Sequence, residues 1–98
     1  MKKEYNCCDM RGMLSFLMLF LISKKPMHGQ ELADEIEKRK GVRPSPGTIY
    51  PALKYLKRNN FIKESKEGKI IVYTLTKEGE EALKNARILF CKTFKDIF

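Results

Sequence analysis

The residues best suited to chemistry lie between Arg43 and Phe61, in the stretch RPSPGTIYPALKYLKRNNF. Basic, aromatic and hydroxyl side chains are frequent in this stretch, and it contains no aspartate or glutamate. Lysine and arginine side chains neutralise phosphates, while serine and threonine hydroxyls and free backbone N–H groups donate further hydrogen bonds to them. The composition of the segment therefore favours binding of a phosphate-lined partner.

The second half of this stretch predicts a helix with two different faces when it is read at about 100° per residue. Ile49, Leu53 and Leu56, with Ala52 beside them, gather on the side that must face a core. The opposite side is basic and aromatic, which favours recognition of DNA; a well-capped core helix with a solvated outer face is the simpler alternative. The expected DNA-contacting residues are Arg43, Ser45, Gly47, Thr48, Tyr50, Lys54, Lys57 and Arg58, followed by Lys66 and Lys69 in a hairpin.

Three prolines shape the start of this helix. Pro44 keeps the residues before it extended, and Pro46 suits the first helical position after Ser45 as the N-cap. Pro51 falls inside the helix, where its missing N–H leaves the Gly47 carbonyl without its usual partner. We therefore expect a slight kink or a tightened first turn rather than a broken helix.

Cysteine and histidine residues do not form a metal-binding or catalytic pattern. The cysteines are Cys7, Cys8 and Cys91, and His28 is the only histidine. Adjacent cysteines rarely bridge each other and no paired C-x-x-C is present, so we expect reduced thiols in a cytoplasmic protein with no metal and no cofactor. His28 stands three residues before Glu31, as in a capping box, and we expect it to start a helix. No nucleophile and base are paired, so we do not expect an enzyme.

The charge and length of the chain restrict its partners. With 98 residues and a net charge of +8, the chain is one small domain that favours an anionic partner, either nucleic acid or a membrane surface. A lysine-rich solvated face is the alternative. The apolar run MLSFLMLFLI, at residues 13–22, is far shorter than the roughly 20 residues that span a bilayer. We expect it to form a helix that is buried on all sides, and we expect no membrane partner.

The order of expected elements gives the fold class. Helices are expected at residues 9–23, over the segment MHGQELADEIEKRKG with Gly41 as its C-terminal cap, and from the Ser45 cap to about residue 60. A hairpin follows, with FIKES and IIVYTL on either side of a turn at Glu67 and Gly68, and a last helix starts at Lys77 after Thr76. This predicts an α+β, mainly α, winged helix-turn-helix with three helices and a two-stranded wing. We assign residues 1–76 to this DNA-binding unit and residues 77–98 to one C-terminal dimerisation helix in the same compact domain.

Two motifs resemble a known family. The segments KPMHGQELADEIEKRKGVRPSPGTIYPALKYLKRNNFI and YTLTKEGEEAL are similar to those of PadR transcriptional regulators, over residues 13–83. The resemblance implies a winged-helix homodimer that represses transcription at palindromic operators, with its third helix in the major groove and Tyr50 at the DNA surface. The single C-terminal helix resembles the smaller PadR subgroup. Gln30 stands where the family usually has an aromatic residue, and the tryptophans that bind flat drugs in some small members are missing.

Apolar residues in the last helix predict self-association. They extend beyond what a small winged-helix core can cover, which favours a two-fold interface with the first or last helix of a second copy. Folding back on its own chain is the alternative. A small hydrophobic effector is a further possible partner, and the sequence does not identify it. A second function stays open, in which the winged helix binds an acidic protein through its basic face. The expected interface residues are Phe16, Phe20, Leu83, Ala86, Leu89, Phe90, Phe94 and Ile97.

Overall fold

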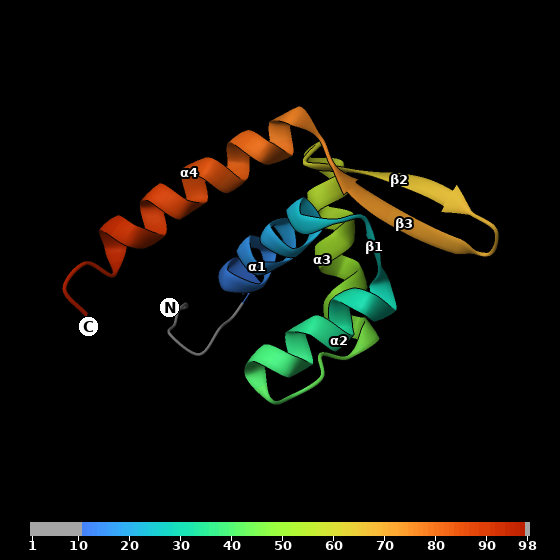
Figure 1. Cartoon of the computed structure of the whole chain (residues 1–98), viewed down its shortest axis with the longest axis horizontal. Coiled ribbons are helices and arrows are strands. Elements are labelled where there is room, and N and C mark those ends of the chain that lie inside the picture. The colour runs from blue at the N-terminus through green and yellow to red at the C-terminus, as the bar shows by residue number, and fades with distance from the viewer. Residues whose placement is uncertain (1–10, 98) are drawn as a thin grey trace.

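The computed structural model describes residues 11–97, which form four helices and one small sheet (Figure 1). Cys7, Cys8 and Phe98 lie outside the described residues. Among the described residues, none of the helices combines the length and the hydrophobicity that crossing a bilayer requires. In chain order the elements are α1 (Arg11–Lys24), β1 (Met27–His28), α2 (Gly29–Lys40), α3 (Pro46–Arg58), β2 (Ile62–Glu67), β3 (Ile70–Leu75) and α4 (Lys77–Thr93).

The helix α1 is the centre of the core. It was expected from residue 9, and residues 9 and 10 lie outside the described part; its last turn carries Lys24, and Pro26 follows. The expectation that α1 is buried on all sides is wrong for a single chain, because Phe16 and Phe20 are only half-buried. Its apolar residues point in more directions than one small domain can cover. Its buried residues are Leu14, Met18, Leu19, Leu21 and Ile22.

The helix α2 has the two caps that its sequence predicts. Glu31 N–H donates to His28 Nδ1 over 3.4 Å, and His28 N–H donates to Glu31 Oε1 over 3.1 Å. These two bonds form the expected capping box and satisfy backbone groups that the helix start leaves free. The bond from the His28 backbone is the main reason that the pKa of Glu31 is lowered. At the other end, Gly41 adopts a left-handed φ of 81°, which glycine tolerates best.

The sheet contains one strand more than the sequence predicted. The wing, which comprises β2, β3 and their turn, pairs from Ile62 with Leu75 to Glu67 with Ile70, and Gly68 makes the turn with a φ of 68°. Met27 and His28 were expected at the start of the second helix, but they form β1 and pair antiparallel with β3. The strand order is therefore β1-β3-β2. Two residues are too few to show the alternation of buried and exposed side chains that marks a strand. They nevertheless pair with backbone groups on the edge of β3 that would otherwise be free.

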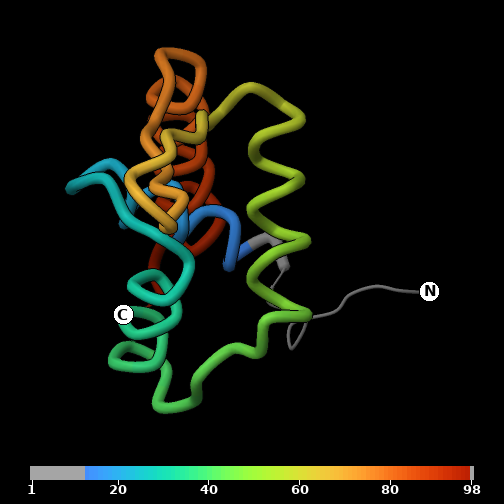
Figure 2. The backbone as a smooth tube through the Cα atoms, turned by 90° about the vertical axis from the view of Figure 1, so that its right-hand side faces the viewer, coloured from blue at the N-terminus to red at the C-terminus, as the bar shows by residue number. Residues whose placement is uncertain are grey.

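Helices α2, α3 and α4 pack around α1. Leu32 and Ile36 of α2 and Leu53 of α3 are almost fully buried against it, and each such side chain stabilises the fold by about 1.5–3 kcal/mol. As expected, α4 starts at Lys77 after Thr76, and the Thr76 hydroxyl caps the helix by accepting a bond from Gly79 N–H over 2.9 Å. Figure 1 shows α4 and the wing extending in opposite directions from the helical body. In Figure 2, α3 runs along one side of the molecule, with α2 and the wing on the other.

Candidate nucleic-acid interface

The helix α3 begins at Pro46, immediately after Ser45, as predicted. The Ser45 carbonyl accepts bonds from both Thr48 N–H, over 2.9 Å, and Ile49 N–H, over 3.0 Å, which is a tightened first turn. Ser45 occupies the N-cap position, but its hydroxyl makes no capping bond and lies 3.2 Å from Thr48 Oγ1. The helix then continues through Pro51 without a break. Two hydroxyl groups therefore remain exposed at the helix start.

The two predicted faces of α3 are present in the structure. Ile49, Leu53 and Leu56 are buried in the core, and Ala52 packs partly against it. The outer face carries Tyr50, which is 47% exposed, among basic and small residues. Contact with DNA remains a prediction for these side chains. The other exposed members of the expected set on α3 are Gly47, Thr48, Lys54, Lys57 and Arg58.

Tyr50 lies directly against the start of α2. A methyl group added at Gly29 would lie only 2.7 Å from the Tyr50 hydroxyl oxygen and 3.1 Å from two ring carbons. Burial raises the pKa of Tyr73 on β3, and the neighbouring Glu64 and Tyr50 raise it further. Gly29 was not among the residues predicted from the sequence to shape this site. Glycine is a poor helix former, so its presence in the first turn of a helix could have indicated that another side chain packs closely against that position.

Arg43 lies in the α2–α3 turn, and its guanidinium is bound to side chains of α2. Its Nη1 donates to Asp34 and, over 3.3 Å, to Glu37, while its Nη2 donates to Gln30 over 2.6 Å. The hydrogen bond to Asp34 is the main reason that the pKa of Arg43 is raised. Arg43 was expected to contact DNA, and its partners on α2 were not predicted from the sequence.

Lys57 is also paired within the chain. Its Nζ lies 3.0 Å from Glu64 Oε1, so the charge of this lysine on α3 is partly neutralised by a carboxylate on β2. The α3 segment itself carries no acid, but neighbouring elements bring acidic side chains to two of its cations. Within residues 11–97, no carboxylate pairs with the remaining cations of the expected set, which are Lys54, Arg58, Lys66 and Lys69.

The wing presents both charge and apolar surface. Lys66 and Lys69 flank the turn and are exposed, as expected. Ile70 and Ile71 are also exposed, at 47% and 41%, which the sequence analysis did not anticipate because a run of β-branched residues predicts a buried strand. The tip of the wing is therefore amphipathic rather than purely basic.

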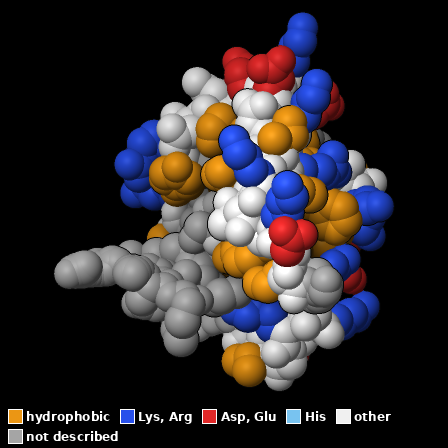
Figure 3. All heavy atoms as spheres, turned by 90° about the vertical axis from the view of Figure 1, so that its left-hand side faces the viewer, with side chains coloured by type: hydrophobic (Ala, Val, Ile, Leu, Met, Phe, Trp, Pro, Cys, Tyr) orange, Lys and Arg blue, Asp and Glu red, His pale blue; other side chains and the backbone are white. Residues whose placement is uncertain are grey.

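The second half of α4 carries the unpaired apolar surface, which lies apart from α3. Leu89 on α4 is 64% exposed, and Ile97, which follows the helix, is 60% exposed. The last helix was expected to run to residue 98, but α4 ends at Thr93 with Phe94 as its C-cap. Phe90 is half-buried, with its ring centroid 5.6 Å from that of Phe16 on α1 and 4.7 Å from that of Phe94. Figure 3 faces the C-terminal end of α4 and shows hydrophobic side chains lying among lysines and arginines there.

The expected interface residues differ in how much surface they can offer. Leu83 is only 4% exposed and belongs to the core of its own chain, so it offers almost no surface to a partner. Ala86, Phe16 and Phe20 are half-buried, and Phe94 is exposed. The first half of α4 thus packs on its own domain, while the second half leaves apolar side chains uncovered.

Comparisons with known proteins agree on one family. The model of the Transcriptional regulator PadR-like family matches residues 18–85. Transcriptional regulator YqjI of Escherichia coli (strain K12) is 35% identical over 80 residues, which cover 78% of this chain and 38% of that protein. The chain thus spans about two fifths of the length of this relative.

Solved structures share the fold. A transcriptional regulator from Clostridium thermocellum superposes with a TM-score of 0.81 at 23% identity, covering 96% of this chain and 95% of that one. A PadR family transcription regulator from Clostridium difficile R20291 gives a TM-score of 0.73 at 28% identity, covering 86% and 92%. Together with the winged-helix arrangement and the family match over most of the chain, these similarities show that the protein belongs to the PadR-like family of transcriptional regulators.

Proposed function

We propose that the protein binds duplex DNA sequence-specifically as a homodimer and represses transcription from a palindromic operator. The observation that carries this proposal is the exposed face of α3, on which Tyr50, Lys54 and Arg58 project without an acidic residue of the same helix. A helix of this kind fits the major groove, where cations and hydroxyls position it on phosphates and side chains reach base edges. The wing lysines would contact the flanking backbone.

The exposed end of α4 supports the homodimer. A second copy would cover Leu89, Phe94 and Ile97, and it would also cover the half-buried aromatic residues of α1. To bind successive turns of the major groove, the two copies of α3 in such a dimer must lie about 34–36 Å apart. Such a dimer reads an inverted repeat, and repression follows if the operator overlaps a promoter.

Selection from random duplexes tests sequence-specific binding. An enriched inverted repeat with half-sites about 10 bp apart supports the proposal, and binding is then measured against salt concentration. Within residues 11–97, four cations of the expected DNA-contacting set have no ion pair. If these four reach phosphates in each protomer, eight contacts per dimer give a slope of log affinity against log salt of about −7. Lys54→Ala should weaken binding and reduce this slope by about 1.8 per dimer, while Lys92→Ala on α4 should change neither. No preference over random duplex would refute the proposal, and the acidic-protein alternative would then be favoured.

Sedimentation of the purified chain tests the homodimer separately. Leu89→Glu would place a charge in the apolar surface of α4, and we expect it to shift the protein towards the monomer without changing its helix content. Lys84→Glu, on the same helix and also exposed, is the matched control. A parent chain that sediments as a monomer at all concentrations would contradict the dimer, and the operator would then contain a single half-site.

A further inference from the structure

The α2–α3 turn, at residues 41–45, is held mainly by one side chain. Gly41 N–H donates a hydrogen bond to a carbonyl of α2, and the Ser45 carbonyl accepts hydrogen bonds from the first turn of α3. Between them, within residues 11–97, no backbone–backbone hydrogen bond involves Val42, Arg43 or Pro44. Val42 is largely exposed and therefore adds little packing. The direction in which α3 leaves α2 thus depends on the core contacts of the two helices and on what Arg43 binds.

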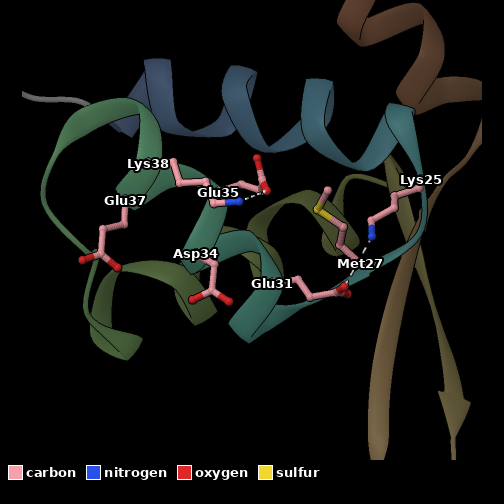
Figure 4. Close-up of a pocket in the computed structure, with 7 residues that line it drawn as sticks. All are labelled: Lys25, Met27, Glu31, Asp34, Glu35, Glu37 and Lys38. Atoms are coloured by element: carbon pink, nitrogen blue, oxygen red, sulfur yellow. Dashed lines mark hydrogen bonds and ion pairs between the residues drawn. The ribbon is translucent and has the colours of Figure 1, made fainter.

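Arg43 binds along one stripe of α2. Gln30, Asp34 and Glu37 are spaced by four and three residues, so their side chains lie on one face of the helix. The guanidinium reaches all three, from the second residue of α2 to its last turn. Figure 4 shows Asp34 and Glu37 projecting from one side of α2, while Glu35 and Lys38 meet on another side. An arginine fork has enough donors to hold three acceptors at once, whereas a lysine ammonium is a point charge.

We infer that Arg43 is a positioning residue that fixes the orientation of α3 against α2, and that it does not bind a DNA phosphate. This inference rests on the proposed function, because it assigns Arg43 a task in presenting α3 to DNA. Three of the five N–H donors of the guanidinium are already taken, and the two carboxylates offset the positive charge that would attract a phosphate. Arg43 therefore leaves the set of expected DNA-contacting residues. It would affect DNA binding only through α3, the helix that follows it.

Two kinds of variant distinguish positioning from phosphate contact by the sign of their effect. The double variant Asp34→Asn, Glu37→Gln loosens the fork and removes two negative charges near the DNA. If Arg43 positions α3, the misplaced helix outweighs the lost repulsion, and this variant binds the selected duplex roughly 2- to 10-fold more weakly. If Arg43 binds phosphate, the freed arginine and the lost repulsion make binding tighter, and the inference is refuted. Unchanged binding also refutes it.

Substitution of Arg43 itself is the second test of positioning against phosphate contact. Positioning predicts that Arg43→Ala and Arg43→Lys both weaken binding, with a slope within about 0.5 of the parent. A phosphate contact predicts that Arg43→Ala lowers the slope by about 1.8 per dimer and that Arg43→Lys retains most of the affinity. Lys92→Ala, an exposed cation on α4, is the matched control for loss of a positive charge.

Hydrogen exchange separates failure of this inference from failure of the proposed function. The amides of Thr48 and Ile49, which both donate to the Ser45 carbonyl, should exchange several-fold faster in Arg43→Ala than in the parent. The Phe94 amide at the end of α4 should be unaffected. If the parent binds no duplex, the proposed function fails while this measurement still tests the fork. Unchanged exchange at the start of α3 would refute positioning by Arg43.

Discussion

The contact between Gly29 and Tyr50 provides a direct test of how α3 is presented. In Gly29→Ala the new methyl group would lie 2.7 Å from the Tyr50 hydroxyl oxygen, whereas ordinary contact begins at 3.4 Å. The hydroxyl must therefore move by about 0.7 Å, and the ring carbons at 3.1 Å must move with it. Because Tyr50 is half exposed, the ring can swing outwards while the core stays intact.

The expected result is a specific loss of DNA affinity with little loss of stability. If the Tyr50 hydroxyl donates one hydrogen bond to the operator, displacing it costs about 0.5–1.5 kcal/mol, which is roughly a 2- to 13-fold weaker complex. Tyr50→Ala should lose at least as much DNA affinity as Gly29→Ala. The free energy of unfolding of Gly29→Ala should stay within about 1 kcal/mol of the parent value, because alanine is the better helix former and offsets part of the strain.

A double-mutant cycle decides whether the effect passes through Tyr50. Binding of the selected duplex is measured by fluorescence anisotropy for the parent, Gly29→Ala, Tyr50→Ala and the double variant. In the Tyr50→Ala background the atoms that clash are gone, so the Gly29 substitution should have no further effect on affinity. An undiminished loss in that background would refute the steric argument. Parent-like affinity in Gly29→Ala would show that the position of Tyr50 does not matter for binding.

Other parts of the structure give further predictions. Glu64→Gln should release Lys57, and DNA binding should tighten a few-fold with a slope steeper by about 1 per protomer; a flatter slope in the salt titration would contradict this. Gly79→Ala would bring a methyl group within 1.9 Å of a backbone oxygen, so thermal unfolding should show a loss of about 3 kcal/mol or more. The lowered pKa of Glu31 stabilises the fold above its usual value of 4.5, and this contribution is lost as pH falls through the folded pKa. Urea unfolding of Glu31→Gln should therefore approach the parent at acid pH, and a constant difference would exclude this linkage.

The sequence predicted the elements whose local signals agree with their packing. The capping box at His28 and Glu31, the glycine end of α2, the start of α4 after Thr76 and the turn at Gly68 were all confirmed. Each of these depends on residues three or four positions apart, so the chain carries the information locally. The buried face of α3 was equally clear, because its apolar spacing matches the helical period.

The contacts between elements could not be read in the same way. Strand β1 forms only because β3 offers a free edge, and two residues carry no periodicity. The side chains that bind Arg43 lie six to thirteen positions away, and the partner of Lys57 lies on another element. Exposure of Ile70 likewise depends on what covers the wing, which its β-branched residues do not indicate.

These contacts change the meaning of the net charge. The net charge of +8 is a property of the whole chain, and the absence of acidic residues from α3 is a property of one helix. A bound phosphate would instead interact with the charges that lie close together on the folded surface. On that surface Asp34 and Glu37 neutralise a cation before α3, and Glu64 neutralises one near its end. Salt dependence follows from released counterions, so it should report the unpaired cations rather than the total. If α3 binds DNA as proposed, carboxylates from α2 and the wing would limit unspecific attraction at both ends of α3, while its central face, with Tyr50 and Lys54, would remain free to read sequence.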